Sequence, residues 1–108
     1  MNSRILNVGK NKGLARVFLD KQILLKNGIQ FGMHYDYFIV NPNLIIIRFT
    51  ESGLKRVSGK IGRPVIDISN RKLDSYFGNS KTYKLSFLKS GNAIDKDNSD
   101  KFRIEKIA

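Results

Sequence analysis

Two basic, glycine-containing segments hold the residues whose types and spacing point most clearly to chemistry. The first spans residues 9–13 and the second spans residues 51–63. Glycine lets a backbone approach a phosphate closely, and lysine and arginine neutralise its charge. Arginine can also contact a guanine edge through two hydrogen bonds. The cationic residues of these segments that we assign to nucleic-acid binding are Lys10, Lys12, Lys55, Arg56, Lys60 and Arg63.

These residues also have ordinary structural interpretations. The segment 55–63 fits a solvated connector, and two lysines in a turn of glycine and asparagine are common. Arg16 lies in an apolar stretch, where it could pair with Asp36 or another carboxylate. The aromatic residues could stack on bases, but most alternate with polar residues at strand spacing, which is typical of a core.

The charge and composition restrict the function further. The chain has 108 residues, 20 Lys+Arg against 9 Asp+Glu, and a formal net charge of +11. Such an excess indicates a polyanionic partner, most often nucleic acid. Because the chain has no cysteine and one histidine, His34, it cannot form a zinc finger, a thiol nucleophile or a two-histidine metal site.

Motifs for catalysis and for metal binding are incomplete. Gly59-Lys60 lacks the leading glycine and the following Ser or Thr of a phosphate-binding loop. The acidic run 95–100 opens like a calcium loop, but Asp100 and Lys106 stand where that loop needs glycine and glutamate. Asp67 and Asp74 are not brought together by their spacing. We therefore expect no enzyme, no cofactor and no metal.

Membrane insertion and secretion are not expected either. The longest apolar run, Leu44 to Ile47, is far shorter than the roughly 20 residues that a membrane-spanning helix needs. The first ten residues have no apolar core of a secretory signal. A soluble, cytoplasmic protein is the expectation.

The apolar patterns predict one compact domain that is mainly β with short helices, an α+β class. Helices capped by Asp20 and by Ser69 or Asn70 carry Leu24 and Leu73 on their buried faces. The predicted strands lie within residues 1–8 and at 16–19, 35–40, 44–49, 64–68, 82–88 and 93–94, and an edge strand at 102–105 follows the loop 95–100.

The same order of parts occurs twice, over residues 9–49 and 55–94. In each, a basic segment is followed by a strand, a short capped helix, a glycine, a strand, a turn and a strand. Aligning Leu19 with Ile68 places Leu24 on Leu73 and Val17 on Ile66, an offset of 49 residues. A half of this size cannot bury its own apolar face, so the two halves must pack together.

The first half resembles the AbrB/SpoVT/MazE class of swapped-hairpin DNA-binding domains. The resemblance is carried by residues 13–29, with Arg16-Val17-Phe18-Leu19 matching the strand of that class and Gly28-Ile29 the turn after its helix. Residues 37–49 match the closing hairpin. Ala15 and Asp20 stand where the class usually has glycine and proline. In the second half, residues 63–68 take the place of the strand.

The resemblance implies that two βαβ swapped-hairpin-like halves, 9–49 and 55–94, pack as one small barrel-like domain. The class builds its DNA-binding layer from two interleaved halves, so this chain would be a monomer with an internal pseudo-dimer or a homodimer. Residues 95–108 would form a C-terminal loop and edge strand. By carry-over, Arg16 and the flanking basic loops would face DNA.

The leading hypothesis is a sequence-preferring double-stranded DNA-binding protein that regulates transcription, of phage, plasmid or bacterial origin. One alternative is a small phage or mobile-element protein that inhibits a host or defence protein by binding an acidic partner. Another alternative is an RNA-binding module.

Overall fold

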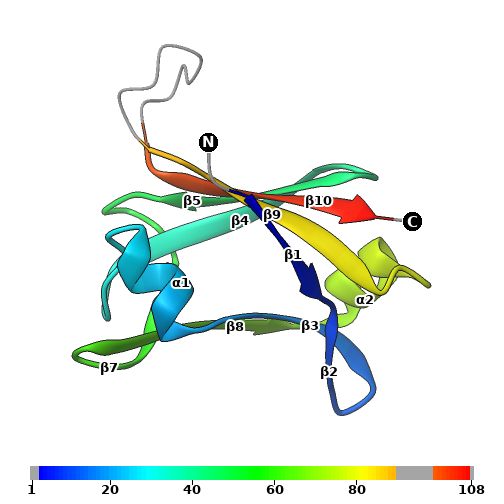
Figure 1. Cartoon of the computed structure of the whole chain (residues 1–108), viewed down its shortest axis with the longest axis horizontal. Helices are drawn as coiled ribbons and strands as arrows, with labels where there is room; N and C mark the ends of the chain where they lie inside the picture. Colours follow the sequence, from blue (N-terminus) through cyan, green and yellow to red (C-terminus); the bar gives the residue numbers. More distant parts are fainter. Residues whose placement is uncertain (1–2, 90–98, 108) are drawn as a thin grey trace.

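Two antiparallel sheets face each other across one hydrophobic core, with a short helix between them at either end (Figure 1). The computed structural model describes residues 3–89 and 99–107. The four-stranded sheet has the order β2 (Gly9–Asn11), β3 (Leu14–Leu19), β8 (Arg63–Ser69), β7 (Ser58–Lys60). The six-stranded sheet has the order β1 (Ser3–Asn7), β9 (Thr82–Leu88), β10 (Lys101–Ile107), β5 (Leu44–Phe49), β4 (His34–Asn41), β6 (Lys55–Arg56). This mainly β architecture confirms the predicted fold class.

The two helices begin where the sequence predicts. Helix α1 (Lys21–Lys26) starts after Asp20, whose carboxylate accepts a hydrogen bond of 3.0 Å from the backbone N–H of Ile23. Helix α2 (Arg71–Phe77) starts after Asn70, whose side-chain oxygen accepts one of 2.9 Å from Leu73. Each cap satisfies a backbone donor that a helix start leaves unpaired.

The core is built from alternate residues of the strands and from one face of each helix. The largest fully buried side chains come from both sheets and both helices, among them Leu19, Leu24, Ile47, Phe77 and Phe102. Alternate residues of a strand point to opposite sides of a sheet, so each sheet presents one apolar side to the core and one side outward. The apolar spacing in the sequence therefore places cationic residues such as Arg16 and Arg63 on the outward side.

Strands occupy equivalent places on the two sides of both sheets, although β1 and β10 lie outside the predicted halves 9–49 and 55–94. In the four-stranded sheet, β3 and β8 pair at the centre, with β2 and β7 outside them. In the six-stranded sheet, β5 and β10 pair at the centre, followed outward by β4 and β9 and then by β6 and β1. β3 begins at residue 14 and β8 at residue 63, which is the 49-residue offset of the predicted repeat. The arrangement is therefore approximately two-fold symmetric.

Three expectations from the sequence need correction. The C-terminal strand is not at an edge, because β10 pairs with β9 on one side and with β5 on the other. The two sheets do not close into a barrel. The basic segments 9–13 and 55–63 are largely strands, since their backbones pair in β2, β6 and β7. The predicted strand at 93–94 and the loop at 95–98 lie outside the described residues.

Candidate nucleic-acid interface

The outward side of the four-stranded sheet collects several of the candidate residues. Every second residue of β3 and β8 is buried against the core, which leaves the alternate residues pointing outward. Residues paired across antiparallel strands share a side, which extends this surface onto β7. We call this surface the outer face and define it by Leu14, Arg16, Phe18, Ser58, Lys60, Arg63, Val65 and Asp67.

Two hairpins, which we call the arms, extend the outer face at opposite ends. The first arm is the β2–β3 hairpin, and its turn residues Lys12 and Gly13 have φ of 53° and 83°. Positive φ at both positions matches the right-handed twist of the two strands. The second arm is the β7–β8 hairpin, whose turn is Ile61-Gly62. It carries Lys60 and Arg63 as cross-strand partners.

The central strands set the spacing of the two arms. Because β3 and β8 run antiparallel, with Arg16 opposite Ser69, the arms project from opposite ends of the sheet. Extended to the strand ends beside the two turns, this register puts Arg63 eight positions from Leu14, which is about 25 Å along the strands at roughly 3.3 Å per residue. This distance corresponds to about seven base pairs of duplex DNA at 3.4 Å each.

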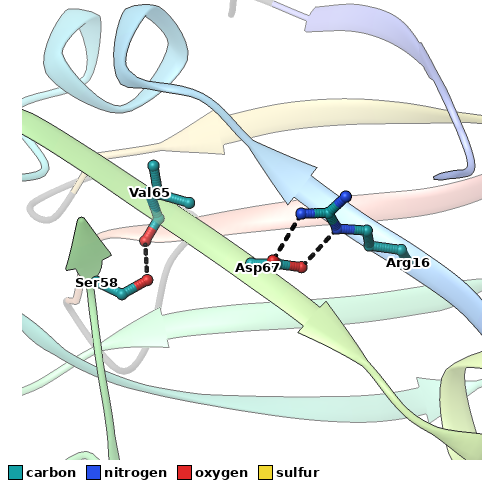
Figure 2. Close-up of polar contacts among 4 residues, drawn as sticks. All are labelled: Arg16, Ser58, Val65 and Asp67. Carbon is teal, nitrogen blue, oxygen red and sulfur yellow. Dashed lines mark hydrogen bonds and ion pairs between the residues drawn. The ribbon is translucent and has the colours of Figure 1, made fainter. Parts of the chain in front are cut away.

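Arg16 is held by a carboxylate at the centre of the outer face. Its Nε and Nη2 donate hydrogen bonds of 2.7 Å each to the two oxygens of Asp67, as Figure 2 shows. The guanidinium carbon lies 4.6 Å from the centre of the Phe18 ring. The sequence left open whether Arg16 pairs with Asp36 or with another carboxylate, and the structure pairs it with Asp67. The centre of the outer face is therefore close to neutral.

The Arg16–Asp67 pair shifts both groups toward their charged forms. The hydrogen bonds from Arg16 lower the pKa of Asp67 below its ordinary value of 3.8. The same hydrogen bonds raise the pKa of Arg16. Each side chain is about one-third exposed, so solvent screens the attraction.

We expect the stability of the protein to lose this contribution in acid. Because the pKa of Asp67 is lower in the folded than in the unfolded state, the pair stabilises the fold above the ordinary carboxyl pKa. That stabilisation disappears as the pH falls through the folded-state pKa. In urea unfolding curves measured from pH 2 to pH 6, the Asp67→Asn variant should show a smaller loss of stability in acid than the unaltered protein. Parallel curves for the two proteins would contradict the assigned role.

The second arm has a further internal contact. The Ser58 hydroxyl donates a hydrogen bond of 3.0 Å to the carbonyl oxygen of Val65, across the strand pair that supports Lys60 and Arg63 (Figure 2). On β7, Gly59 lies between Ser58 and Lys60. It is paired opposite Pro64 and has a φ of +91°. The arm is therefore a paired hairpin, and the backbone positions of its two cationic residues are defined.

Three predicted residues lie away from the outer face. Lys10 is paired opposite the buried Ala15, and its Nζ lies 3.9 Å from Asp74 on α2. Lys55 and Arg56 belong to β6 in the other sheet. Lys55 Nζ lies 5.5 Å from the centre of the Tyr37 ring. The structure therefore brings Lys60 and Arg63 together on the second arm. It places Arg16 at the centre of the outer face and Lys12 in the turn of the first arm, and it separates Lys10, Lys55 and Arg56 from them.

Other residues of this surface were missed by sequence reasoning. Phe18 is 43% exposed and Ile61, at the tip of the second arm, is 88% exposed. Asp67 is the acid that neutralises Arg16. The alternation of β3 could have placed Phe18 beside Arg16, because residues 16 and 18 share a side. The exposure of Ile61 could not be read from its spacing, since turn residues follow no alternation.

The described residues form no group of three or more His, Asp or Glu side chains that could hold a metal ion. The two helices of the described ranges are each too short to cross a membrane. Comparison of the chain with protein-family models, with curated proteins and with solved structures yields no match.

Proposed function

We propose that this protein binds double-stranded DNA through the outer face and its two arms, and that it regulates transcription by doing so. The observation that carries the proposal is the distribution of charge on this surface. Lys12, Lys60 and Arg63 lie at the arms, whereas the acid Asp67 is confined to the centre and paired with Arg16. The arms are the parts of the surface that would reach phosphates first.

The spacing of the arms supports a duplex as the ligand. Two cationic ends about 25 Å apart match phosphates about seven base pairs apart on a regular helix. A flexible single strand has no such fixed spacing. The hairpin backbones are already paired, so little loop entropy is lost on binding.

Both halves of the chain contribute to the four-stranded sheet, which supports the proposal. The four-stranded sheet takes one hairpin from each half of the chain, β2–β3 and β7–β8. The resemblance to swapped-hairpin DNA-binding domains leads us to expect a DNA-binding layer that both halves of the chain build together. The proposal assigns the outer face of this sheet to DNA.

The contribution of the arms can be measured by fluorescence anisotropy with a labelled 20-base-pair duplex over a series of salt concentrations. We expect the variant Lys12→Ala/Lys60→Ala/Arg63→Ala to bind much more weakly at low salt. The slope of log K against log salt is negative, and each lost phosphate contact should make it shallower by about 0.9. The three substitutions together should therefore reduce its magnitude by about 2.7. No binding by the unaltered protein at low salt would refute the proposal.

Two matched variants test whether binding depends on the outer face in particular or on the positive charge of the protein in general. The variant Lys55→Ala/Arg56→Ala removes two cations from the other sheet and should change the slope little. The variant Asp67→Asn removes the acid of the outer face and should tighten binding several-fold. A greater effect of the Lys55/Arg56 change than of the arm change would place the site elsewhere. Stronger competition by structured RNA than by duplex DNA would make the ligand RNA.

A further inference from the structure

One edge of the six-stranded sheet is only partly covered. Strand β6 pairs with β4 at His34 and Tyr35 alone. At the equivalent edge, β1 pairs with five residues of β9, from Thr82 to Ser86. Within the described ranges, no strand pairs with the outer side of β4 from Asp36 to Asn41. Among the strands that the structure describes, β1 thus completes one edge, and the equivalent edge along β4 stays open.

The open edge is largely apolar and carries no lysine or arginine. Phe38, Ile39 and Val40 are 42%, 40% and 55% exposed. The stretch from Asp36 to Asn41 has no lysine or arginine, although the chain carries 20 of them. Charged side chains, lysine above all, are a common device that keeps edge strands from pairing with other chains. A bulge between Ile39 and Asn41 limits the regular part of this edge to Asp36–Ile39.

The backbone of β4 presents unpaired groups along this edge. Tyr35 is paired opposite Lys55 of β6, and Val57 donates a hydrogen bond of 2.8 Å to the Met33 carbonyl on the same side. The His34 carbonyl instead accepts from Thr50, on the β5 side. Backbone groups of successive strand residues alternate in direction, so those of Tyr37 and Ile39 point to the open edge.

A cationic hollow of about 620 Å³ adjoins this edge. Ile39, Asn41 and Pro42 line it from the end of β4 and its turn, and α2 and β10 line the other side. The side chains from α2 and β10 are Arg71, Lys72, Ser75, Tyr76 and Lys106. Lys106 Nζ donates a hydrogen bond of 2.9 Å to the Tyr76 carbonyl and lies 5.1 Å from the centre of its ring. Three cations and no acid line an otherwise largely apolar space.

At the opposite edge of the six-stranded sheet, β1 shows how a strand paired with the edge is placed beside a helix. There β1 lies along β9, and its Ser3 and Arg4 line a hollow together with Ile23 and Lys26 of α1. Leu6 of the same strand packs against the core. A strand added to the edge thus contributes side chains to the space beside the helix. A strand on β4 would do the same beside α2.

We propose that the β4 edge and the adjoining hollow bind an extended segment of a partner protein, in which acidic residues alternate with apolar ones. The backbone groups of Tyr37 and Ile39 pair with the segment. Its apolar side chains cover Phe38 on the outward side of the sheet, and its carboxylates, at the alternate positions, reach Arg71, Lys72 and Lys106 on the side of Ile39. Charge favours this occupant over a second copy of the chain, because a second β4 strand offers only Asp36 to the three cations. The inference is independent of DNA binding by the outer face.

The probe for this surface is a fluorescein-labelled heptapeptide of alternating valine and glutamate. We expect it to bind the full chain and to slow hydrogen exchange of the Tyr37 and Ile39 amides, observed by NMR. The variant Arg71→Glu/Lys72→Glu should bind it at least tenfold more weakly. Acidic residues in the first turn of a helix favour its dipole, so this variant should fold. The control is Lys21→Glu. Lys21 is the first residue of α1, as Arg71 is of α2, and this variant should bind the peptide normally.

The same experiment can overturn the inference in several ways. Absence of binding at millimolar peptide would do so, as would equal binding of a peptide with lysine in place of glutamate. Unchanged binding by Arg71→Glu/Lys72→Glu would exclude the hollow. Concentration-dependent dimerisation that protects the same amides without peptide would make the edge a self-interface. The DNA-arm variant should bind the peptide normally, so that failure of either proposal can be distinguished from failure of the other.

Discussion

Replacing Gly59 with alanine will destabilise the protein by about 3 kcal/mol or more and disrupt the second arm. A Cβ at this position would overlap the carbonyl oxygen of Arg63 and would meet the backbone of Val65. Both neighbours are backbone atoms, which cannot rotate away as a side-chain end can. The φ of +91° is also one that alanine rarely adopts. Urea unfolding followed by circular dichroism measures the loss.

Gly62 provides the matched control for Gly59 in the same hairpin. Its φ is +80°, but an added Cβ would meet no atom within 4 Å. The Gly62→Ala variant should therefore lose only the cost of the left-handed conformation, about 1 kcal/mol. Equal losses for the two variants would show that the overlap at Gly59 is relieved by movement of the hairpin.

The Gly59 change also connects stability with the proposed function. Lys60 and Arg63 depend on the pairing of β7 with β8, which the alanine would force apart. We therefore expect Gly59→Ala to weaken binding of duplex DNA at temperatures where the rest of the domain remains folded. Gly62→Ala should leave that binding nearly unchanged.

Replacing Phe102 with alanine is the second change with a large expected effect, a loss of about 3–5 kcal/mol. Phe102 is fully buried, and its ring centre lies 5.0 Å from that of Phe87 and 5.9 Å from that of Phe49. It projects from β10, which joins the strands of the two halves in the six-stranded sheet. Its removal leaves a cavity at the junction of the halves. Small domains are stable by about 5–15 kcal/mol, so this variant should be only marginally folded at 37 °C.

Phe18→Ala is the control for this prediction. Because Phe18 is 43% exposed on the outer face, its removal creates no enclosed cavity and should cost within about 1 kcal/mol. Equal destabilisation by the two changes, measured in urea, would contradict the position of Phe102 in the core.

Local sequence patterns were enough to predict much of the fold. Asp20 and Asn70 each cap a helix through a hydrogen bond to a residue three positions later, an interaction that needs no distant partner. The strands at 44–49 and 82–88 were predicted with the bounds that the structure shows. Alternation of apolar residues acts through the geometry of one strand, so it is visible within a few residues of sequence.

Contacts between distant residues could not be predicted in the same way. Asp67 lies 51 residues from Arg16, and a pattern of charges does not show which carboxylate an arginine will meet. The strand at 101–107 has the alternation of an edge strand, with a cation or an acid at every second position of its first half. The structure places it between β9 and β5, where its exposed side is the outward side of the sheet.

By itself, the sequence determined the mainly β class with two short capped helices, the excess of positive charge and the repeated order of elements. These follow from composition and from interactions within a few residues. Only the tertiary structure decided which cations share a surface, which strand edge stays open and which helix lies beside it. Such arrangements depend on strand pairing between residues far apart in the chain, and many pairings satisfy the same alternation. Packing around the core at Leu19, Ile47 and Phe102 selects one of them.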